Sequence, residues 1–369
     1  MTKRFRIGVN LLCFGNDGLG GTWTFSRRLF ESMQASDQLE FVFFCRNDFE
    51  LERWLRIPEG GIKYERRGVS IGGRKWMRVL YEQTVLPFAA EGIDLMFSPY
   101  VGNPLFHPRF RTITTIHDLT PFYVPKKYGR VQGLYVRLMT RLLLIASNKI
   151  ITVSESSRSD LVERMRTSRE KISVVFNMTD RSVGGVPRFG KYFLFVGTLQ
   201  PAKNLEGTLR AFARFHERYD VSGHELVVVG ADGWGNLRLS SLVEELGIRD
   251  CVQFRGYVTD EQLQDLYLGC KALVLLSLYE GFGIPPLEAL KYGKPSIVSN
   301  VSSLPEVVGK TGIKVDPLDA EAAASAMREI AEAPEKYLCG RGAQLRKFAP
   351  EAQVRRFFNV LTEVCNSRE

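Results

Sequence analysis

The sequence is short of the residues that build disulfide scaffolds and metal sites. Its 369 residues include six cysteines, at positions 13, 45, 251, 270, 339 and 365, with no CxxC pair, and only four histidines. This pattern excludes a disulfide framework and a cysteine zinc site, and we expect reduced thiols in a cytoplasmic protein.

Long apolar runs are also missing. The longest, such as residues 142–146 and 272–276, fall far short of the about 20 residues that a membrane-spanning helix needs. The first 14 residues pass from a short basic stretch into a strand-like run with no small-residue cleavage site, so we expect no signal peptide. The composition, 44% hydrophobic and 25% charged, is ordinary for a globular protein and excludes disorder, collagen and coiled coil for the whole chain.

The excess positive charge is confined to the first half of the chain. Residues 1–182 hold 28 Lys and Arg against 18 Asp and Glu, whereas residues 183–369 hold 22 against 23. The excess is concentrated at 53–78 and 126–171. Solvated helix faces are one interpretation. The other is a surface for an anionic partner, where phospholipid headgroups fit better than nucleic acid because no nucleic-acid-binding motif accompanies the charges.

Strand-like and helical patterns alternate along the chain. Short apolar runs separated by helical stretches are typical of parallel sheets with helices on both faces. A break rich in Gly, Pro and basic residues at 181–191 divides the runs into two series and is interpreted as a linker. We therefore predict an α/β fold of two doubly wound, Rossmann-like domains that bind ligands beyond the carboxyl ends of their strands.

The predicted boundaries divide the chain into three parts. Residues 1–182 form a basic first domain with a possible membrane face, and residues 183–350 form the second domain. Residues 351–369 form an amphipathic helix that is free to pack back on the first domain.

The segment SLYEGFGIPPLEALKYG, residues 277–293, carries the strongest candidate site. A buried strand ends near Glu280, a glycine loop follows, and two prolines fit the first turn of a helix. Free amides at that helix start favour an anion or a hydroxyl group. Glu280 and Glu288 then face one ligand from two sides, an arrangement suited to sugar hydroxyls. If Glu280 only ended a strand and Glu288 only complemented the helix dipole, the Gly-Phe-Gly and Pro-Pro sequences would have no role.

Other strand ends carry further candidates. Lys203 lies between a strand and a helix start, where it is suited to neutralise a phosphate, although a solvated loop lysine is the alternative. Glycines 15, 18, 20 and 21 allow backbone amides to approach a phosphate, but the GxGxxG spacing is absent. His117 can bond a substrate hydroxyl or be structural, and segments 229–233 and 256–263 are suited to hold a nucleotide base.

Together these segments resemble the family-4 retaining glycosyltransferases, which have the GT-B fold of two Rossmann-like domains with parallel sheets facing across a cleft. The most specific part is the E-x7-E motif, here Glu280-GFGIPPL-Glu288. Further matches in family order are GLGG, IHDLTP, VSESSRSDL, VGTLQPAKNL, FRGYVTDEQLQDLY and SSLPEVVG, so the resemblance covers nearly the whole chain.

The resemblance implies catalytic roles for Glu280, at the donor sugar, and His117, near its anomeric carbon. The other implied residues bind the donor: Glu288 at the ribose, Lys203 at the diphosphate, Gly20 and Gly21 at the distal phosphate, Phe282, Gly283 and Ile284 at the sugar, and Gly230 and Val258 near the base. The family commonly has arginines where this chain has Thr198 and Ala202, so phosphate binding would depend more on Lys203, the glycine loop and the helix start.

The resemblance also implies a reaction: transfer of a hexosyl group from a nucleoside diphosphate sugar to an acceptor hydroxyl, with retention of the anomeric configuration. Front-face attack is the family's favoured account, and no carboxylate pair is placed for double displacement. No DxD sequence occurs, so we expect no metal and no cofactor besides the substrate.

Similarity to bacterial enzymes indicates which donor and which acceptor to expect. The PxKN form of the lysine motif is similar to that of bacterial mannosyltransferases, which favours GDP-mannose or a related GDP-sugar over a UDP-sugar. We expect a saccharide or lipid-linked saccharide acceptor in bacterial surface polysaccharide or lipopolysaccharide synthesis, with peripheral contact at the inner face of the cytoplasmic membrane. Two alternatives stay open: a sugar-nucleotide epimerase of the same fold, and a non-catalytic basic membrane- or nucleic-acid-binding protein.

Overall fold

The chain forms two compact units. The structure, a computed structural model, describes residues 4–15, 20–72, 74–107, 109–124, 130–179, 188–219, 223–233 and 238–367. Unit 1 comprises Met1–Phe122, Tyr128–Met178 and Pro350–Glu369, and unit 2 comprises Tyr123–Lys127 and Thr179–Ala349. Residues 181–187 of the expected linker lie outside the described residues.

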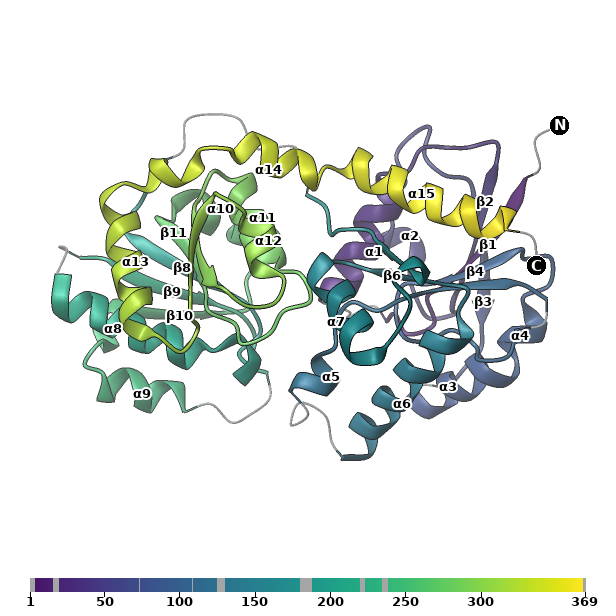
Figure 1. Ribbon diagram of the computed structural model, residues 1–369, viewed down its shortest axis with the longest axis horizontal. Helices are drawn as coiled ribbons and strands as arrows, with labels where there is room; N and C mark the ends of the chain where they lie inside the picture. The colour runs from purple at the N-terminus through teal and green to yellow at the C-terminus, as the bar shows by residue number, and fades with distance from the viewer. Residues whose placement is uncertain are drawn as a thin grey trace. The chain divides into compact units, whose positions relative to one another are not determined.

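Unit 1 contains a seven-stranded sheet in the order β3-β2-β1-β4-β5-β6-β7, in which neighbouring strands are parallel (Figure 1). Its strands are β1 (Phe5–Asn10), β2 (Leu39–Arg46), β3 (Tyr64–Val69), β4 (Leu95–Ser98), β5 (Arg111–Thr115), β6 (Lys149–Thr152) and β7 (Ile172–Val174). The central strands are buried along nearly their whole length because helices cover the sheet, as their continuous apolar sequences predict.

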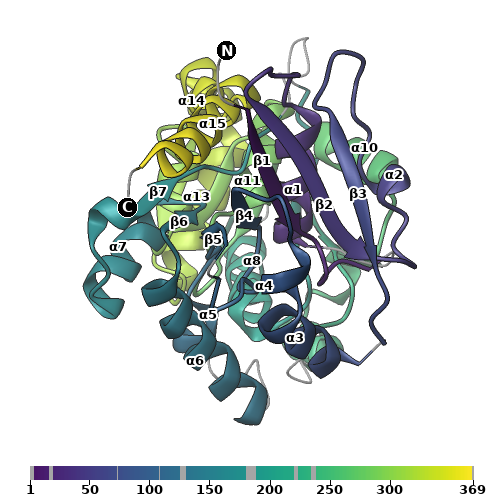
Figure 2. The ribbon, with the colours of Figure 1, turned by 90° about the vertical axis from the view of Figure 1, so that its right-hand side faces the viewer.

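The helices of unit 1 include one from the end of the chain. They are α1 (Gly21–Glu31), α2 (Leu51–Trp54), α3 (Lys75–Thr84), α4 (Leu86–Ala89), α5 (Thr120–Tyr123), α6 (Arg130–Ala146), α7 (Glu155–Met165) and α15 (Pro350–Asn366), with a 3-10 turn at Arg169–Lys171. In α15, Phe357 is fully buried, and its ring centroid lies 4.8 Å from that of Phe97 and 6.3 Å from that of Phe30. The helix α15 itself packs against α1 and β4 (Figure 2). The amphipathic segment expected at 351–369 therefore packs on unit 1.

Unit 2 contains a six-stranded parallel sheet in the order β10-β9-β8-β11-β12-β13. Its strands are β8 (Tyr192–Val196), β9 (Glu225–Val229), β10 (Val252–Gly256), β11 (Ala272–Leu275), β12 (Ser296–Ser299) and β13 (Gly312–Val315). Its helices are α8 (Leu205–Tyr219), α9 (Leu239–Glu245), α10 (Asp260–Gly269), α11 (Ile284–Lys291), α12 (Leu304–Val308), α13 (Ala320–Glu332) and α14 (Arg341–Lys347), with 3-10 turns at Pro201–Lys203, Arg249–Cys251 and Pro334–Leu338.

The two sheets have the same doubly wound topology. In unit 1 the strand order reverses between β1 and β4, and in unit 2 it reverses between β8 and β11. Such a reversal opens a crevice beyond the carboxyl ends of the two strands, because their following loops diverge to opposite faces. The predicted α/β fold of two Rossmann-like domains is confirmed. Within the described residues, no helix combines the length and the apolar character that crossing a membrane requires.

Candidate functional site

The strand reversal of unit 2 brings two predicted residues together. Lys203 ends the short turn after β8, and Glu280 lies in the loop after β11. The Nζ atom of Lys203 lies 2.5 Å from Oε1 of Glu280, and both side chains are largely buried. These residues are 77 positions apart, so the pair exists only because β8 and β11 are neighbours in the sheet.

Serine side chains fix Glu280 from both ends. Ser277 Oγ donates to Oε1 of the carboxylate at 2.8 Å. The Glu280 backbone N–H donates to Ser302 Oγ at 3.0 Å, and Ser303 Oγ donates to the Glu280 carbonyl at 3.0 Å. A carboxylate held at its head and its backbone is preorganised to accept hydrogen bonds from a ligand.

Asn204 joins the loops that carry the pair. It adopts the left-handed conformation, with φ of 51°, which asparagine tolerates better than most residues. Its Nδ2 donates to the carbonyls of Leu276, at 3.0 Å, and Pro317, at 2.8 Å. The sequence predicts a helix start after Lys203 but no role for Asn204. Its position directly after Lys203 was the available signal for this role.

Glu288 lies in the second turn of α11. Gly283 caps the helix with φ of 103°, and the two prolines that follow Ile284 lie in its first turn, as predicted. Oε2 of Glu288 accepts a hydrogen bond from the Tyr267 hydroxyl at 3.2 Å. Burial and the nearby Glu288 charge raise the pKa of Tyr267 well above its usual value, so this phenol stays a donor. Sequence reasoning missed Tyr267, because no local pattern connects α10 to α11.

The other predicted residues of the loop have mixed environments. The Phe282 side chain is buried against Phe348, with ring centroids 5.4 Å apart, and its carbonyl accepts from Ser303 Oγ at 2.7 Å. Ile284 is the first residue of α11 and is half-buried.

Gly230 and Val258 follow β9 and β10 at the same edge of the sheet. The Gly230 N–H donates to the Gly256 carbonyl at 2.9 Å. A Cβ atom at Gly230 would lie 1.9 Å from the Gly197 carbonyl oxygen, so only glycine fits there. Val258 is half-buried and precedes the Thr259 capping box of α10.

His117 follows β5 in unit 1. Its Nε2 lies 2.8 Å from the Pro99 carbonyl, which accepts, so Nε2 carries the proton. Burial lowers the pKa of the imidazole, which favours the neutral ring with Nδ1 as a hydrogen-bond acceptor. The ring also packs edge-on against Phe25 at 5.3 Å.

Gly20 and Gly21 begin α1. Gly20 is its N-cap, with φ of 131°, and no atom lies within 4 Å of where its Cβ would be. Both glycines are exposed, whereas Gly18 lies outside the described residues.

A buried polar network that sequence reasoning missed lies at the strand reversal of unit 1. Asn10, the last residue of β1, accepts from the Tyr100 hydroxyl at 2.9 Å, and the same hydroxyl donates to Glu82. Arg78 donates to both carboxylate oxygens of Glu82, at 2.8 and 3.0 Å. Burial raises the pKa of Glu82, and the Arg78 charge opposes that rise. The i,i+4 spacing of Arg78 and Glu82 was the only signal in the sequence.

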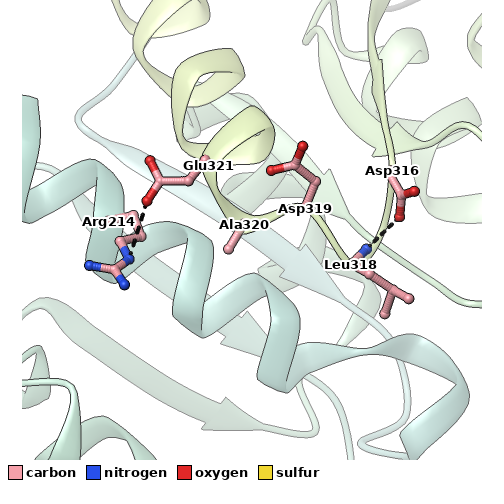
Figure 3. A pocket seen from close by; sticks show the side chains of 6 residues that line it. All are labelled: Arg214, Asp316, Leu318, Asp319, Ala320 and Glu321. Atoms are coloured by element: carbon pink, nitrogen blue, oxygen red, sulfur yellow. Dashed lines mark hydrogen bonds and ion pairs between the residues drawn. The ribbon is translucent and has the colours of Figure 1, made fainter.

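A separate pocket of unit 2 borders the start of α13 (Figure 3). In it, Arg214 pairs with Glu321 at 3.4 Å and the Leu318 N–H donates to Asp316. None of the predicted site residues lines this pocket. Across the described ranges, no three His, Cys, Asp or Glu side chains cluster so as to hold a metal ion.

Comparisons with known proteins agree with the resemblance. The O-antigen chain mannosyltransferase B of Escherichia coli is 33% identical over 231 residues, 58% of this chain and 60% of that protein. The O-antigen chain mannosyltransferase RfbU of Salmonella typhimurium is 31% identical over 229 residues, 62% of each protein. The chain thus spans about three fifths of the length of these curated relatives.

Solved structures share the fold at low identity. Sucrose-phosphate synthase from Thermosynechococcus elongatus superposes with a TM-score of 0.76 at 20% identity, covering 98% of this chain and 99% of that one. Anabaena Alr3699/HepE in complex with UDP and glucose superposes with a TM-score of 0.74 at 15% identity, covering 97% and 100%.

Two family descriptions divide the chain between them. "Glycosyltransferase Family 4" matches residues 19–183, and "Glycosyl transferases group 1" matches residues 178–340. The chain therefore belongs to the family-4 type of GT-B glycosyltransferase, as its motifs indicated.

Proposed function

We propose that this protein transfers a hexosyl group from a nucleoside diphosphate sugar to an acceptor hydroxyl, with retention of the anomeric configuration. The observation that carries the proposal is the Lys203–Glu280 ion pair at the strand reversal of unit 2. It puts one cation and one hydrogen-bond acceptor at the place where open α/β sheets bind nucleotides.

Donor binding would exchange the partners of this pair. A diphosphate carries more negative charge than one carboxylate, so it competes for the Lys203 ammonium and leaves Glu280 to accept from sugar hydroxyls. Before the donor binds, Lys203 and Glu280 neutralise each other, so neither largely buried charge is left without a counter-charge. Glu288, oriented by Tyr267, would accept from the ribose hydroxyls, and the strand ends at Gly230 and Val258 would border the base.

The reaction would proceed through an oxocarbenium-like transition state with a departing diphosphate. Lys203 and the amides at the start of α11 would stabilise the charge on the leaving group. In unit 1, the neutral His117 would accept from a sugar hydroxyl through Nδ1, and Gly20 and Gly21 would approach the distal phosphate. Retention would then follow from front-face attack: the acceptor oxygen bonds the anomeric carbon on the face from which the diphosphate leaves, the bond between that carbon and the diphosphate oxygen breaks, and a phosphate oxygen of the leaving group takes the acceptor proton. This step would need no metal ion and no cofactor besides the donor.

The curated relatives support a particular donor and a particular class of acceptor. Both curated relatives named above are O-antigen mannosyltransferases, which supports GDP-mannose as donor and a growing saccharide or lipid-linked saccharide of a bacterial surface polysaccharide as acceptor. Such an acceptor would place the enzyme at the inner face of the cytoplasmic membrane.

The test is thermal stabilisation by GDP-, UDP-, ADP- and dTDP-sugars, followed by product analysis with the preferred donor. Binding raises the melting temperature by mass action, so GDP-mannose should give the largest shift, and Glu288→Gln should remove most of it. With an acceptor saccharide present, NMR should show an α-linked product from the α-linked donor. An epimerised donor formed without acceptor would establish the epimerase instead, and no shift with any donor would overturn the proposal.

A further inference from the structure

The outward face of α6 is apolar where a solvated helix would be polar. Leu134, Leu138, Arg141 and Ile145 are spaced by four, three and four residues, so they form one stripe along the helix. The three apolar members are exposed: 63% for Leu134, 50% for Leu138 and 78% for Ile145. A row of large exposed apolar side chains usually marks an interaction surface.

The stripe runs into a basic pocket at the ends of α6 and α7. The pocket is lined by Arg141, Leu144, Ile145, Arg164, Met165, Arg166, Thr167, Ser168 and Lys171. The four charged side chains that line it in the described part of the chain are all cationic. Arg164 also lies 3.5 Å from Asp160 on its own helix, and Lys171 donates to the Ile145 carbonyl at 2.8 Å. Cations and hydroxyls around an apolar floor suit a phosphate attached to a lipid.

Further exposed apolar side chains lie on the neighbouring helices. On α3, Trp76 is 58% and Leu80 53% exposed, and Phe88 of α4 is also exposed. Arg109 lies over the Phe88 ring, 6.0 Å from its centroid. Figures 1 and 2 both draw α3 next to α6, with α4 next to α3. Tryptophan and arginine beside aliphatic side chains are typical of a membrane interface.

We propose that this surface, the α6 stripe with the α6–α7 pocket and the exposed face of α3, binds an anionic phospholipid bilayer. Leu134, Leu138 and Ile145 enter the boundary between headgroups and acyl chains, and the pocket receives a phosphodiester headgroup. Charge complementarity favours this occupant, because a second copy of the chain would bring an identical cationic pocket and be repelled. Nucleic acid would satisfy the cations but leave the aliphatic stripe exposed to water. The proposal deepens the proposed function by giving access to a lipid-linked acceptor, but the binding itself requires no donor.

The experiment is vesicle co-sedimentation of the full chain without donor or acceptor. Vesicles of phosphatidylcholine are compared with vesicles in which about a third of the lipid is phosphatidylglycerol, at low salt and at high salt. The wild type should bind the anionic vesicles and largely lose binding at high salt. Arg141→Glu with Arg166→Glu should weaken the partition coefficient by about tenfold or more. Leu138→Ser with Ile145→Ser should weaken it by a similar factor.

Matched controls separate the surface from general charge and hydrophobicity. Arg355→Glu, exposed on α15, and Leu318→Ser, exposed in unit 2, should bind vesicles like the wild type. Circular dichroism melts should be unchanged for every variant, and GDP-mannose should stabilise each of them as it does the wild type. Wild-type binding equal on neutral and anionic vesicles, or unchanged binding by both double variants, would overturn the proposal. So would a wild-type dimer that Leu138→Ser with Ile145→Ser dissociates while vesicle binding is absent.

Discussion

At the scale of single residues, the candidate site is a set of charges whose partners come from distant parts of the chain. The sequence predicts the candidate residues, Glu280 and Glu288 from the E-x7-E motif and Lys203 from the segment VGTLQPAKNL. It does not predict that Lys203 and Glu280 pair with each other or that Tyr267 bonds Glu288. Those contacts depend on the register of β8 and β11 and on the packing of α10, which no local pattern contains.

The ion pair gives the first prediction. Lys203→Met should destabilise unit 2 by about 2–4 kcal/mol, because it leaves the Glu280 carboxylate largely buried without its cation. Adding Glu280→Gln should restore much of that loss, since a neutral amide needs no counter-charge. Donor binding should stay weakened at least tenfold in both variants, as titration calorimetry would show. If donor affinity returned with stability, Lys203 would have no direct part in binding.

Tyr267 gives the second prediction, that of a positioning residue. Tyr267→Phe removes the donor to Glu288 and should cost about 1 kcal/mol of stability. It should raise KM for the donor several-fold with little change in kcat, because the ribose contact is made equally in ground and transition states. Tyr219→Phe, on α8, is the matched control and should leave both constants unchanged. A purely structural Tyr267 would lower stability and leave KM alone.

His117 gives a prediction for pH. Its pKa is lowered by burial, so the folded protein prefers the neutral ring and the unfolded chain takes up the proton first. The contribution to stability is present above the unfolded value of about 6.5 and declines as pH falls through the folded pKa. Urea unfolding should show that the free energy of unfolding falls less between pH 7.5 and pH 5 for His117→Asn than for the wild type. If the free energy of unfolding fell equally in both proteins, groups other than His117 would be responsible for the pH dependence.

At the scale of elements, the site is formed by loops that follow parallel strands. The sequence predicts their existence because alternating apolar strands and helices are periodic, and Gly-Phe-Gly followed by Pro-Pro indicates the start of α11. It does not show which loops touch. Asn204 bonds the carbonyls of Leu276 and Pro317, and Gly230 lies against Gly197, only because β8 pairs with both β9 and β11.

Two glycines test this arrangement as a matched pair. Gly230→Ala should destabilise unit 2 by about 3 kcal/mol or more and weaken donor binding, since its Cβ would force the loops after β8 and β9 apart. At Gly256 φ is also positive, 63° against 155° at Gly230, but an added Cβ would meet no atom within 4 Å, so Gly256→Ala should cost only about 1 kcal/mol. Equal losses in urea unfolding would mean that backbone strain alone, and not the close approach, demands glycine at 230.

At the scale of the whole molecule, one sheet topology is used twice with different chemistry. Unit 2 carries the ion pair and the motif glutamates at its strand reversal, whereas unit 1 carries the buried Asn10–Arg78–Glu82–Tyr100 network at the equivalent place. The doubly wound fold was predictable because it depends on patterns repeated along the chain. The network was not, because its members come from β1, α3 and the loop after β4.

The return of α15 to unit 1 carries the last prediction. Phe357 is fully buried against Phe30 and Phe97, so Phe357→Ala should leave a cavity in unit 1 and cost about 3–5 kcal/mol. Phe348 lies only nine residues earlier but packs on Phe282 in unit 2, so Phe348→Ala should instead destabilise that unit. Calorimetry with and without the donor distinguishes the two, because the donor should stabilise the transition of unit 2 more than that of unit 1. Phe357→Ala should lower the temperature of the unfolding transition that the donor shifts least. Phe348→Ala should lower the temperature of the transition that the donor shifts most. If both variants lowered the same transition, the chain would unfold as one cooperative block rather than as two units.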